Sequence, residues 1–165
     1  MKDHGGIRKL SRTALLSVAG WCAFPAASTA KERYDVVVYG GVPCGIAASI
    51  AAKREGAKVL LVEPTRHVGG LNTSGINTAE SEHMLKWTFG GISLEFYENM
   101  GRHYGKQEPA FYFESSVAEK TFLAMLGKER IPIHYGSRVS IVEKEGTDIR
   151  TITLEDGSAF SAKVF

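Results

Sequence analysis

A glycine-rich turn between two apolar segments constrains the fold of this chain more than any other feature. Residues 34–39 (YDVVVY) are a short β-branched run, and residues 40–45 (GGVPCG) follow it directly. Residues 46–54 (IAASIAAKR) are alanine-rich and favour a helix, which Gly56 can end. Residues 58–63 (KVLLVE) indicate a second buried strand. We therefore predict a βαβ unit with two parallel strands.

This unit would bring a phosphate-binding turn close to a ribose-binding acid. A helix N-terminus presents unpaired N–H groups and the positive end of a dipole, which attract a pyrophosphate. Glycines allow the tight turn and let phosphates approach the backbone. Glu63 ends the second strand 23 residues after Gly40, near the spacing at which an acid accepts hydrogen bonds from a ribose diol. The pattern predicts a dinucleotide site, and the charge of Glu63 disfavours a 2′-phosphate.

Val42 and Cys44 are the two residues of the turn whose roles the glycine pattern leaves open. The dinucleotide-binding pattern G-x-G-x-x-G matches at Gly40 and Gly45, whereas Val42 stands where its middle glycine is expected. Cys44 falls in the first turn of the predicted helix, where a thiol pKa can be lowered. We favour a small packing residue at Cys44 over a catalytic thiol, because this position ordinarily takes a small side chain.

The segment after Glu63 extends the pattern beyond a plain dinucleotide-binding unit. Residues 64–75 read PTRHVGGLNTSG and supply a second glycine pair. With the motifs YDVVVYGG-x-P-x-G, LLVEP and GG-x-x-TSG, the chain resembles the FAD-dependent oxidoreductases of the glutathione-reductase-like fold. More narrowly, it resembles a bacterial, often exported group of them. The resemblance covers residues 33–165, and that group commonly has Thr or Ser in place of the middle glycine.

The resemblance implies FAD as the cofactor and a role for each motif. The pyrophosphate would lie along the first turn, the adenosine ribose on the acid, the ribityl chain beside the second glycine pair, and the isoalloxazine near the end of that segment. The adenine would contact a backbone group in a later strand. The implied residues are Gly40, Gly41, Pro43, Cys44 and Gly45 for the pyrophosphate, Glu63 for the ribose, Gly69, Gly70 and Leu71 for the ribityl chain, Ser74 and Gly75 for the isoalloxazine, and Val139 for the adenine.

The rest of the chain fits an α/β fold. Apolar residues recur at helical spacing in residues 92–104 and 117–129, which we expect to be core-facing helices. Residues 131–135 indicate a third parallel strand. Short β runs follow at residues 139–144, 149–155 and 159–165, with a hairpin turn at Asp156-Gly157. We predict a Rossmann-like parallel sheet with helices and a three-stranded β-meander crossover, incomplete at the C-terminus.

No catalytic residue can be assigned from the sequence. His67, His83, His103 and His134 have no partner at a fixed spacing. His67 is the best placed of them, beside the expected flavin loop, and His134 fits a structural role within a strand. The sequence contains no HExxH or CxxC motif, so we expect no metal site.

The N-terminus has the layout of a secretory signal peptide. Basic residues precede the apolar run 14–24, and Pro25 and a small-residue segment follow, with cleavage expected after Ala30. The run is shorter than the ~20 residues that span a bilayer. The leader holds four of the basic residues and Asp3, so residues 31–165 would carry a net charge of −1. We expect a periplasmic or extracellular protein without nucleic acid and, after cleavage, without a membrane.

The chain ends at Phe165 inside an apolar run, which indicates that residues 31–165 are the N-terminal part of a longer FAD-binding domain. The leading hypothesis is an exported FAD-dependent oxidoreductase in which the flavin accepts a hydride or electron pair from a small organic substrate. Two alternatives are an NAD(H)-binding dehydrogenase domain and a secreted nucleotide-binding module without catalysis. The fragment alone is expected to be inactive.

Overall fold

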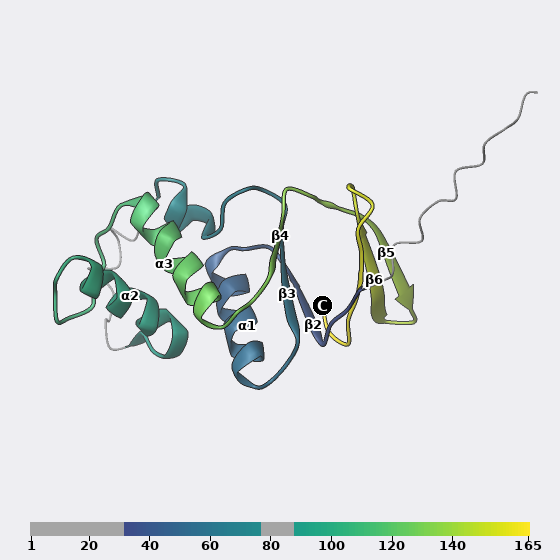
Figure 1. Cartoon of the computed structure of the whole chain (residues 1–165), viewed down its shortest axis with the longest axis horizontal. Helices are drawn as coiled ribbons and strands as arrows, with labels where there is room; N and C mark the ends of the chain where they lie inside the picture. The colour runs from purple at the N-terminus through teal and green to yellow at the C-terminus, as the bar shows by residue number, and fades with distance from the viewer. Residues whose placement is uncertain (1–31, 77–87) are drawn as a thin grey trace, which may run out of the picture.

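The molecule is built in three layers. A computed structural model describes residues 32–76 and 88–165. Helices cover one face of a parallel sheet, and an antiparallel meander lies on the other side (Figure 1). The predicted signal peptide, residues 1–30, and His83 lie outside the described residues. The architecture confirms the predicted mixed α/β fold.

The central sheet is parallel throughout. It contains β2 (Val36–Tyr39), β3 (Val59–Glu63) and β4 (Ile133–Tyr135) in the order β2-β3-β4. Every residue of β3 is buried. Successive side chains of a strand point to opposite faces, and both faces of this sheet are covered. Leu61 packs in the cluster under the helices, whereas Leu60 and Val62 pack in the cluster under the meander. These strands confirm the predicted βαβ unit and its third strand.

Three helices form the first layer: α1 (Pro43–Arg54), α2 (Gly91–His103) and α3 (Ser115–Lys128). Helix α1 begins three residues before the predicted start at Ile46, because Pro43 occupies its first turn, where a missing N–H costs nothing. Gly56 follows its end with a φ of +86°, as the sequence predicts.

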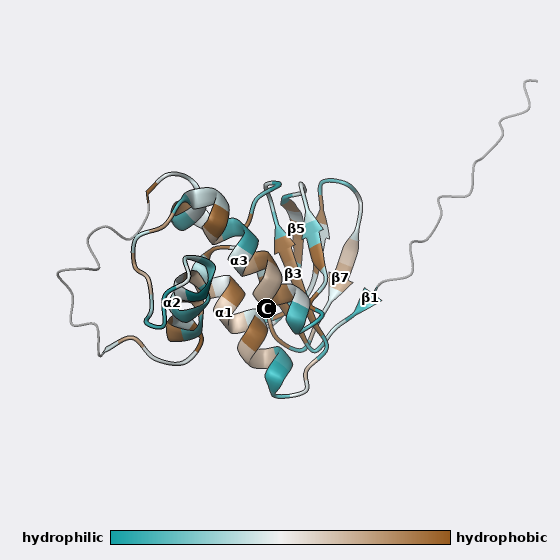
Figure 2. Ribbon diagram, turned by 60° about the vertical axis from the view of Figure 1, so that its left-hand side comes forward, coloured by the Kyte–Doolittle hydropathy of each residue, from teal (hydrophilic) through white to brown (hydrophobic). Residues whose placement is uncertain are grey.

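An aromatic core joins these helices to the sheet. Phe96 of α2 and Phe122 of α3 stack with ring centroids 4.2 Å apart. Met100 is fully buried beside them in the same cluster. Figure 2 shows hydrophobic residues on α1 and α3 and in the sheet beside them. The apolar stripes predicted for both helices are therefore core-facing.

The third layer is the predicted meander of β5 (Val139–Glu145), β6 (Asp148–Leu154) and β7 (Ala159–Ser161). The turn at Asp156 and Gly157 connects β6 to β7, and Gly157 has a φ of +85°. A two-residue strand that the sequence did not reveal, β1 (Glu32–Arg33), adds to β7 in parallel. Next to β1, burial raises the pKa of Tyr34 to about 12, with help from a 2.6 Å bond that its hydroxyl donates to Glu32.

The prediction of one continuous β run over residues 159–165 is wrong. Strand β7 ends at Ser161, and Val164 instead forms a parallel bridge with Val36 of the central sheet. The N–H of Val37 donates to Val164 O at 3.0 Å. The segment is divided because its first part pairs with β6 in the meander, whereas its last part pairs with β2.

Candidate nucleotide-binding site

Two glycines of the turn between β2 and α1 are required, Gly40 for its backbone conformation and Gly45 for the close packing around it. Gly40 has a φ of +112°, a conformation that favours glycine. A Cβ added to Gly45 would lie 1.9 Å from Gly40 O. The start of α1 therefore approaches the end of β2 at a distance that only glycine allows.

The first turn of α1 suits an anion. Among the described residues no side chain caps this end, and the turn itself contains no acidic residue. The N–H of Ile46 bonds to the carbonyl oxygen of Val42 at 2.9 Å. The N–H groups of Cys44 and Gly45 come before it, among those that an α-helix leaves without an intrahelical partner. Cys44 is exposed. The positive end of the helix dipole and these N–H groups suit a phosphate.

The structure explains why Val42 is tolerated in place of glycine. Its φ of −74° is an ordinary extended conformation that any residue adopts. Its side chain lies against the second glycine pair, where a Cβ added to Gly70 would come 3.0 Å from Val42 Cγ1. Gly70 thus leaves room for the side chain that replaces the middle glycine.

Glu63 is a buried carboxylate bound to the glycine turn. It is 6% exposed at the end of β3. The N–H of Gly41 donates to its Oε2 at 2.6 Å. Thr65 donates to Oε1 through its N–H at 2.8 Å and its hydroxyl at 2.7 Å. A Cβ added to Gly41 would lie 2.9 Å from both Glu63 Oε2 and Val68 Cγ1, so this glycine is required for the contact.

The second glycine segment lies beside the first. The N–H of Gly69 donates to Gly41 O at 2.6 Å, and the 3-10 helix η1 (Gly70–Thr73) follows it. Leu71 is 65% exposed. The hydroxyl of Ser74 donates to Gly70 O at 2.8 Å. The two segments predicted to lie along one dinucleotide are therefore in contact, although Gly41 and Gly69 are 28 residues apart.

The end of this segment and the start of β5 are also held in place. The N–H of Gly75 donates to the hydroxyl of Ser115, in the first turn of α3, at 3.1 Å. The N–H of Val139 donates to the hydroxyl of Tyr39 at 3.4 Å. Because Tyr39 ends β2 just before the turn, Val139 lies at the edge of the sheet that carries the glycines.

Tyr135 lies next to the buried acid. It is the partner of Glu63 in the register of β3 and β4. Burial raises the pKa of the Tyr135 hydroxyl, and the negative charges of Glu119 and Glu63 raise it further. Glu63 and Glu119 thus place negative charge near Tyr135, whereas the helix dipole places positive charge at the first turn of α1.

The described histidines do not converge on one another. His67 Nδ1 lies 2.9 Å from Glu119 Oε1 on α3, a partner 52 residues away. His134 Nε2 lies 2.7 Å from Asp156 Oδ2, and its ring packs edge-on against Phe160. His134 thus links β4 to the meander, in agreement with the structural role expected for it.

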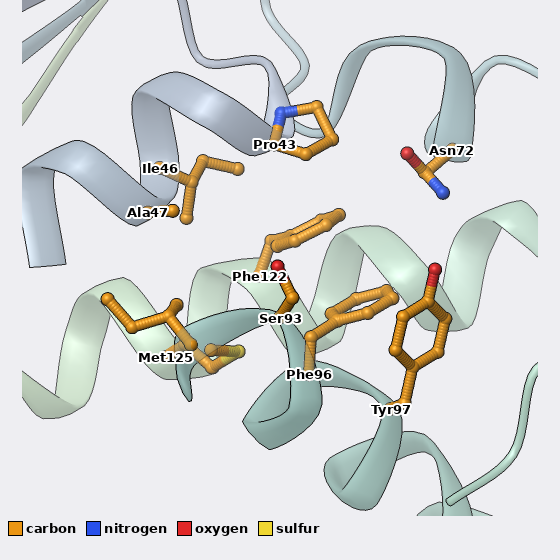
Figure 3. Close-up of a pocket in the computed structure, with 10 residues that line it drawn as sticks. Pro43, Ile46, Ala47, Asn72, Ser93, Phe96, Tyr97, Phe122 and Met125 are labelled. Atoms are coloured by element: carbon orange, nitrogen blue, oxygen red, sulfur yellow. The ribbon is translucent and has the colours of Figure 1, made fainter. Parts of the chain in front are cut away.

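A small apolar cavity lies behind the turn (Figure 3). Its volume is about 70 Å³, and it separates the start of α1 from α2 and α3. Pro43 and Asn72 contribute from the two glycine segments, and Tyr97 reaches toward Asn72 from α2. Pro43 therefore has an apolar environment on its cavity side.

Sequence reasoning missed three residues that build the site. Thr65 holds Glu63, Val68 packs against Gly41, and Ser115 binds the backbone of Gly75. A hydroxyl two residues after the acid was a local signal for Thr65. No local signal marks Ser115, because it comes from α3.

Two features are absent from the described residues. Within residues 32–76 and 88–165, no group of three or more His, Cys, Asp or Glu side chains is placed to hold a metal ion. Among the helices of the same part of the chain, none has the length and apolar character needed to cross a membrane.

Comparison with known proteins identifies two relatives, an oxidoreductase and a reductase. The chain is 38% identical over 85 residues to an NADH:fumarate oxidoreductase of Klebsiella pneumoniae, covering 48% of this chain and 9% of that protein. It is 26% identical over 143 residues to a digeranylgeranylglycerophospholipid reductase of Methanococcus vannielii, covering 81% and 36%. The chain thus spans well under half the length of these relatives.

A solved structure supports the same fold. A flavin-containing monooxygenase from Stenotrophomonas maltophilia superposes with a TM-score of 0.54 at 18% identity, covering 81% of this chain and 37% of that one. The likeness concerns the fold alone.

The geometry fits FAD. Gly41 and Gly45 leave no space for a Cβ at the turn, the first turn of α1 has no acidic residue, and Glu63 presents a buried acceptor beside it. The family described as FAD dependent oxidoreductase matches residues 35–165. The chain belongs to this family of FAD-dependent oxidoreductases, and FAD is its cofactor.

Proposed function

We propose that this chain binds the adenosine and pyrophosphate parts of FAD for an oxidoreductase that acts on a small organic substrate. The observation that carries the proposal is the 2.6 Å hydrogen bond from Gly41 N–H to Glu63 Oε2. It fixes the orientation of a buried acceptor next to the turn and the N-terminus of α1. A ribose on the acid and a pyrophosphate on the helix would then be neighbours, as they are in one dinucleotide.

Each part of the chain would have a separate task. The N–H groups of Cys44 and Gly45 would bind the pyrophosphate, with Gly40, Gly41 and Pro43 shaping its cradle. Glu63 would accept hydrogen bonds from the adenosine ribose. The backbone at Gly69, Gly70 and Leu71 would run beside the ribityl chain, and Ser74 and Gly75 would approach the isoalloxazine. Val139 would contact the adenine through its backbone.

The redox chemistry would belong to the cofactor, which when bound accepts a hydride or electron pair. The residues of this chain would bind and orient it. No catalytic role is proposed for His67, which is bonded to Glu119, or for His134, which is bonded to Asp156 in the link between β4 and the meander. The proposal also includes export of the protein, supported by the signal-peptide layout of residues 1–30.

The identity of the bound nucleotide tests this proposal. The protein is purified in full length and its visible spectrum recorded, then the nucleotide is released by denaturation and separated from FMN, FAD and NAD standards. We expect a yellow protein that releases FAD. Release of FMN would contradict a role for the adenosine-binding groups. A colourless protein that binds NAD but not added FAD would favour the dehydrogenase alternative.

Reduction separates the enzyme from a module without catalysis. The FAD-loaded protein is titrated anaerobically with dithionite and then mixed with candidate organic donors. We expect the flavin to be reduced by dithionite and by at least one donor. A bound flavin that dithionite reduces but that none of the organic donors reduces would support the non-catalytic alternative.

A further inference from the structure

Thr65 occupies part of the surface of Glu63 that a ribose would use. Its backbone N–H and its hydroxyl both lie within 2.8 Å of Glu63 Oε1. The N–H of Gly41 takes up one site on the other oxygen, Oε2. A carboxylate has about four lone-pair sites. The described residues therefore use three of these sites on Glu63, which leaves about one for a ligand.

A ribose diol brings two hydroxyl donors, so one existing contact must yield. The N–H groups of Gly41 and Thr65 are fixed by the backbone of the turn and of the strand end. The hydroxyl of Thr65 is the one donor of the three that can rotate. It also has a second acceptor within reach, because Thr65 Oγ1 lies 3.0 Å from His67 O.

The alternative acceptor is held firmly. The N–H of His67 bonds back to Thr65 Oγ1 at 3.1 Å, and the His67 ring is bonded to Glu119 on α3. The carbonyl of Thr65 accepts a 2.9 Å bond from Gly136 N–H. The loop can therefore keep its shape while the hydroxyl of Thr65 rotates and donates either to Glu63 Oε1 or to His67 O.

The geometry points to Thr65 as a placeholder, a residue whose hydroxyl occupies a site on Glu63 that a ribose hydroxyl takes over on binding. Before the ribose binds, the hydroxyl would donate to the buried Glu63. When the adenosine ribose binds, the hydroxyl turns its proton to His67 O and leaves the carboxylate to the second ribose hydroxyl. This inference rests on the proposed binding of ribose by Glu63.

The placeholder role predicts an unusual sign for a substitution. In Thr65→Val the hydroxyl is absent, so a ribose no longer has to displace a bond to a charged acceptor. Glu63 stays oriented by the two backbone N–H groups. We expect Thr65→Val to bind ADP about fivefold more tightly than wild type, the effect of one modest hydrogen-bond difference. The ligand-free variant should melt a few degrees lower.

A ligand with one hydroxyl fewer provides the matched control. 2′-Deoxy-ADP needs only the lone-pair site that is already free, so Thr65 need not turn. Its affinity should be equal in wild type and Thr65→Val. Thr65→Ser keeps the hydroxyl and should match wild type with both ligands. Thr65→Ala also removes the hydroxyl, without placing a methyl group against the carboxylate, and should repeat the result of Thr65→Val if that variant folds poorly.

Calorimetric titration of the full-length proteins with ADP and 2′-deoxy-ADP distinguishes the outcomes. Tighter binding of ADP alone supports the inference. Weaker or unchanged binding of ADP by Thr65→Val overturns it, as does an equal change for both ligands, which a merely structural role would produce. If wild type binds neither FAD nor ADP, the proposed function fails and the inference fails with it.

Discussion

The backbone N–H of Gly41 donates a 2.6 Å hydrogen bond to Oε2 of Glu63, which lies 22 residues further along the chain. The bond joins the glycine turn after β2 to the last residue of β3. Because Gly69 N–H also donates to Gly41 O, one glycine connects all three segments of the candidate site. Stability and ligand binding should therefore depend on the same few residues.

The close approach of α1 to β2 predicts a large cost for Gly45→Ala. The added Cβ would lie 1.9 Å from Gly40 O, and backbone on both sides would have to move. We expect a loss of about 3 kcal/mol in the free energy of unfolding, measured by chemical denaturation.

Gly127→Ala is the matched control, because Gly127 is also helical and has open space around its Cβ position. Its free energy of unfolding should rise by about 0.5–1 kcal/mol. Equal effects of the two substitutions would show that helix propensity, and not the approach to Gly40, decides the outcome.

The contact of Phe122 with the second glycine segment predicts that α3 supports the site. Phe122 stacks on Phe96, and a Cβ added to Gly69 would come 2.9 Å from its ring. Phe122→Ala should lower the free energy of unfolding by about 3–5 kcal/mol, again measured by denaturation. The adjacent Leu123 is 38% exposed, and Leu123→Ala should lower the free energy of unfolding by less than about 1 kcal/mol. A Phe122→Ala variant as stable as Leu123→Ala would contradict the described packing.

Asp156 predicts a loss of stability in acid. A hydrogen bond from Ser158 N–H, followed by the contact with His134, holds the pKa of this carboxyl below its ordinary value of 3.8. A lowered folded-state pKa adds stability that is fully present above the ordinary value and disappears as the pH falls through the folded value.

Melting curves of wild type and Asp156→Asn between pH 6 and pH 2 test this point, with the pH limits chosen at about two units on either side of the ordinary pKa. We expect wild type to be more stable at the upper end, and the difference to shrink below pH 3.8. A difference that stays constant with pH would rule out the carboxylate as its source.

The sequence was most informative where the determinants are local. The spacing from Gly40 to Glu63 fits within one βαβ unit, so turn, helix and acid could be predicted together. The start of α1 was placed three residues late because Pro43 looks like a turn residue, although it fits the first turn of a helix.

Contacts between distant segments could not be predicted from local sequence patterns. Ser115 and Glu119 come from α3 and meet the glycine segment only after the chain has folded. Strand β1 has two residues, too few for a periodic signal. The division of residues 159–165 between two sheets depends on pairing with Val36, which no alternation of side chains encodes.

Titration of the cofactor-free protein with FAD, for wild type and Glu63→Gln, tests the central claim most directly. Glu63→Gln should bind FAD at least about tenfold more weakly, because an amide places an NH₂ group where Gly41 or Thr65 donates. Glu98→Gln, an exposed change of the same kind on α2, should bind like wild type. Wild-type binding by Glu63→Gln would contradict the account.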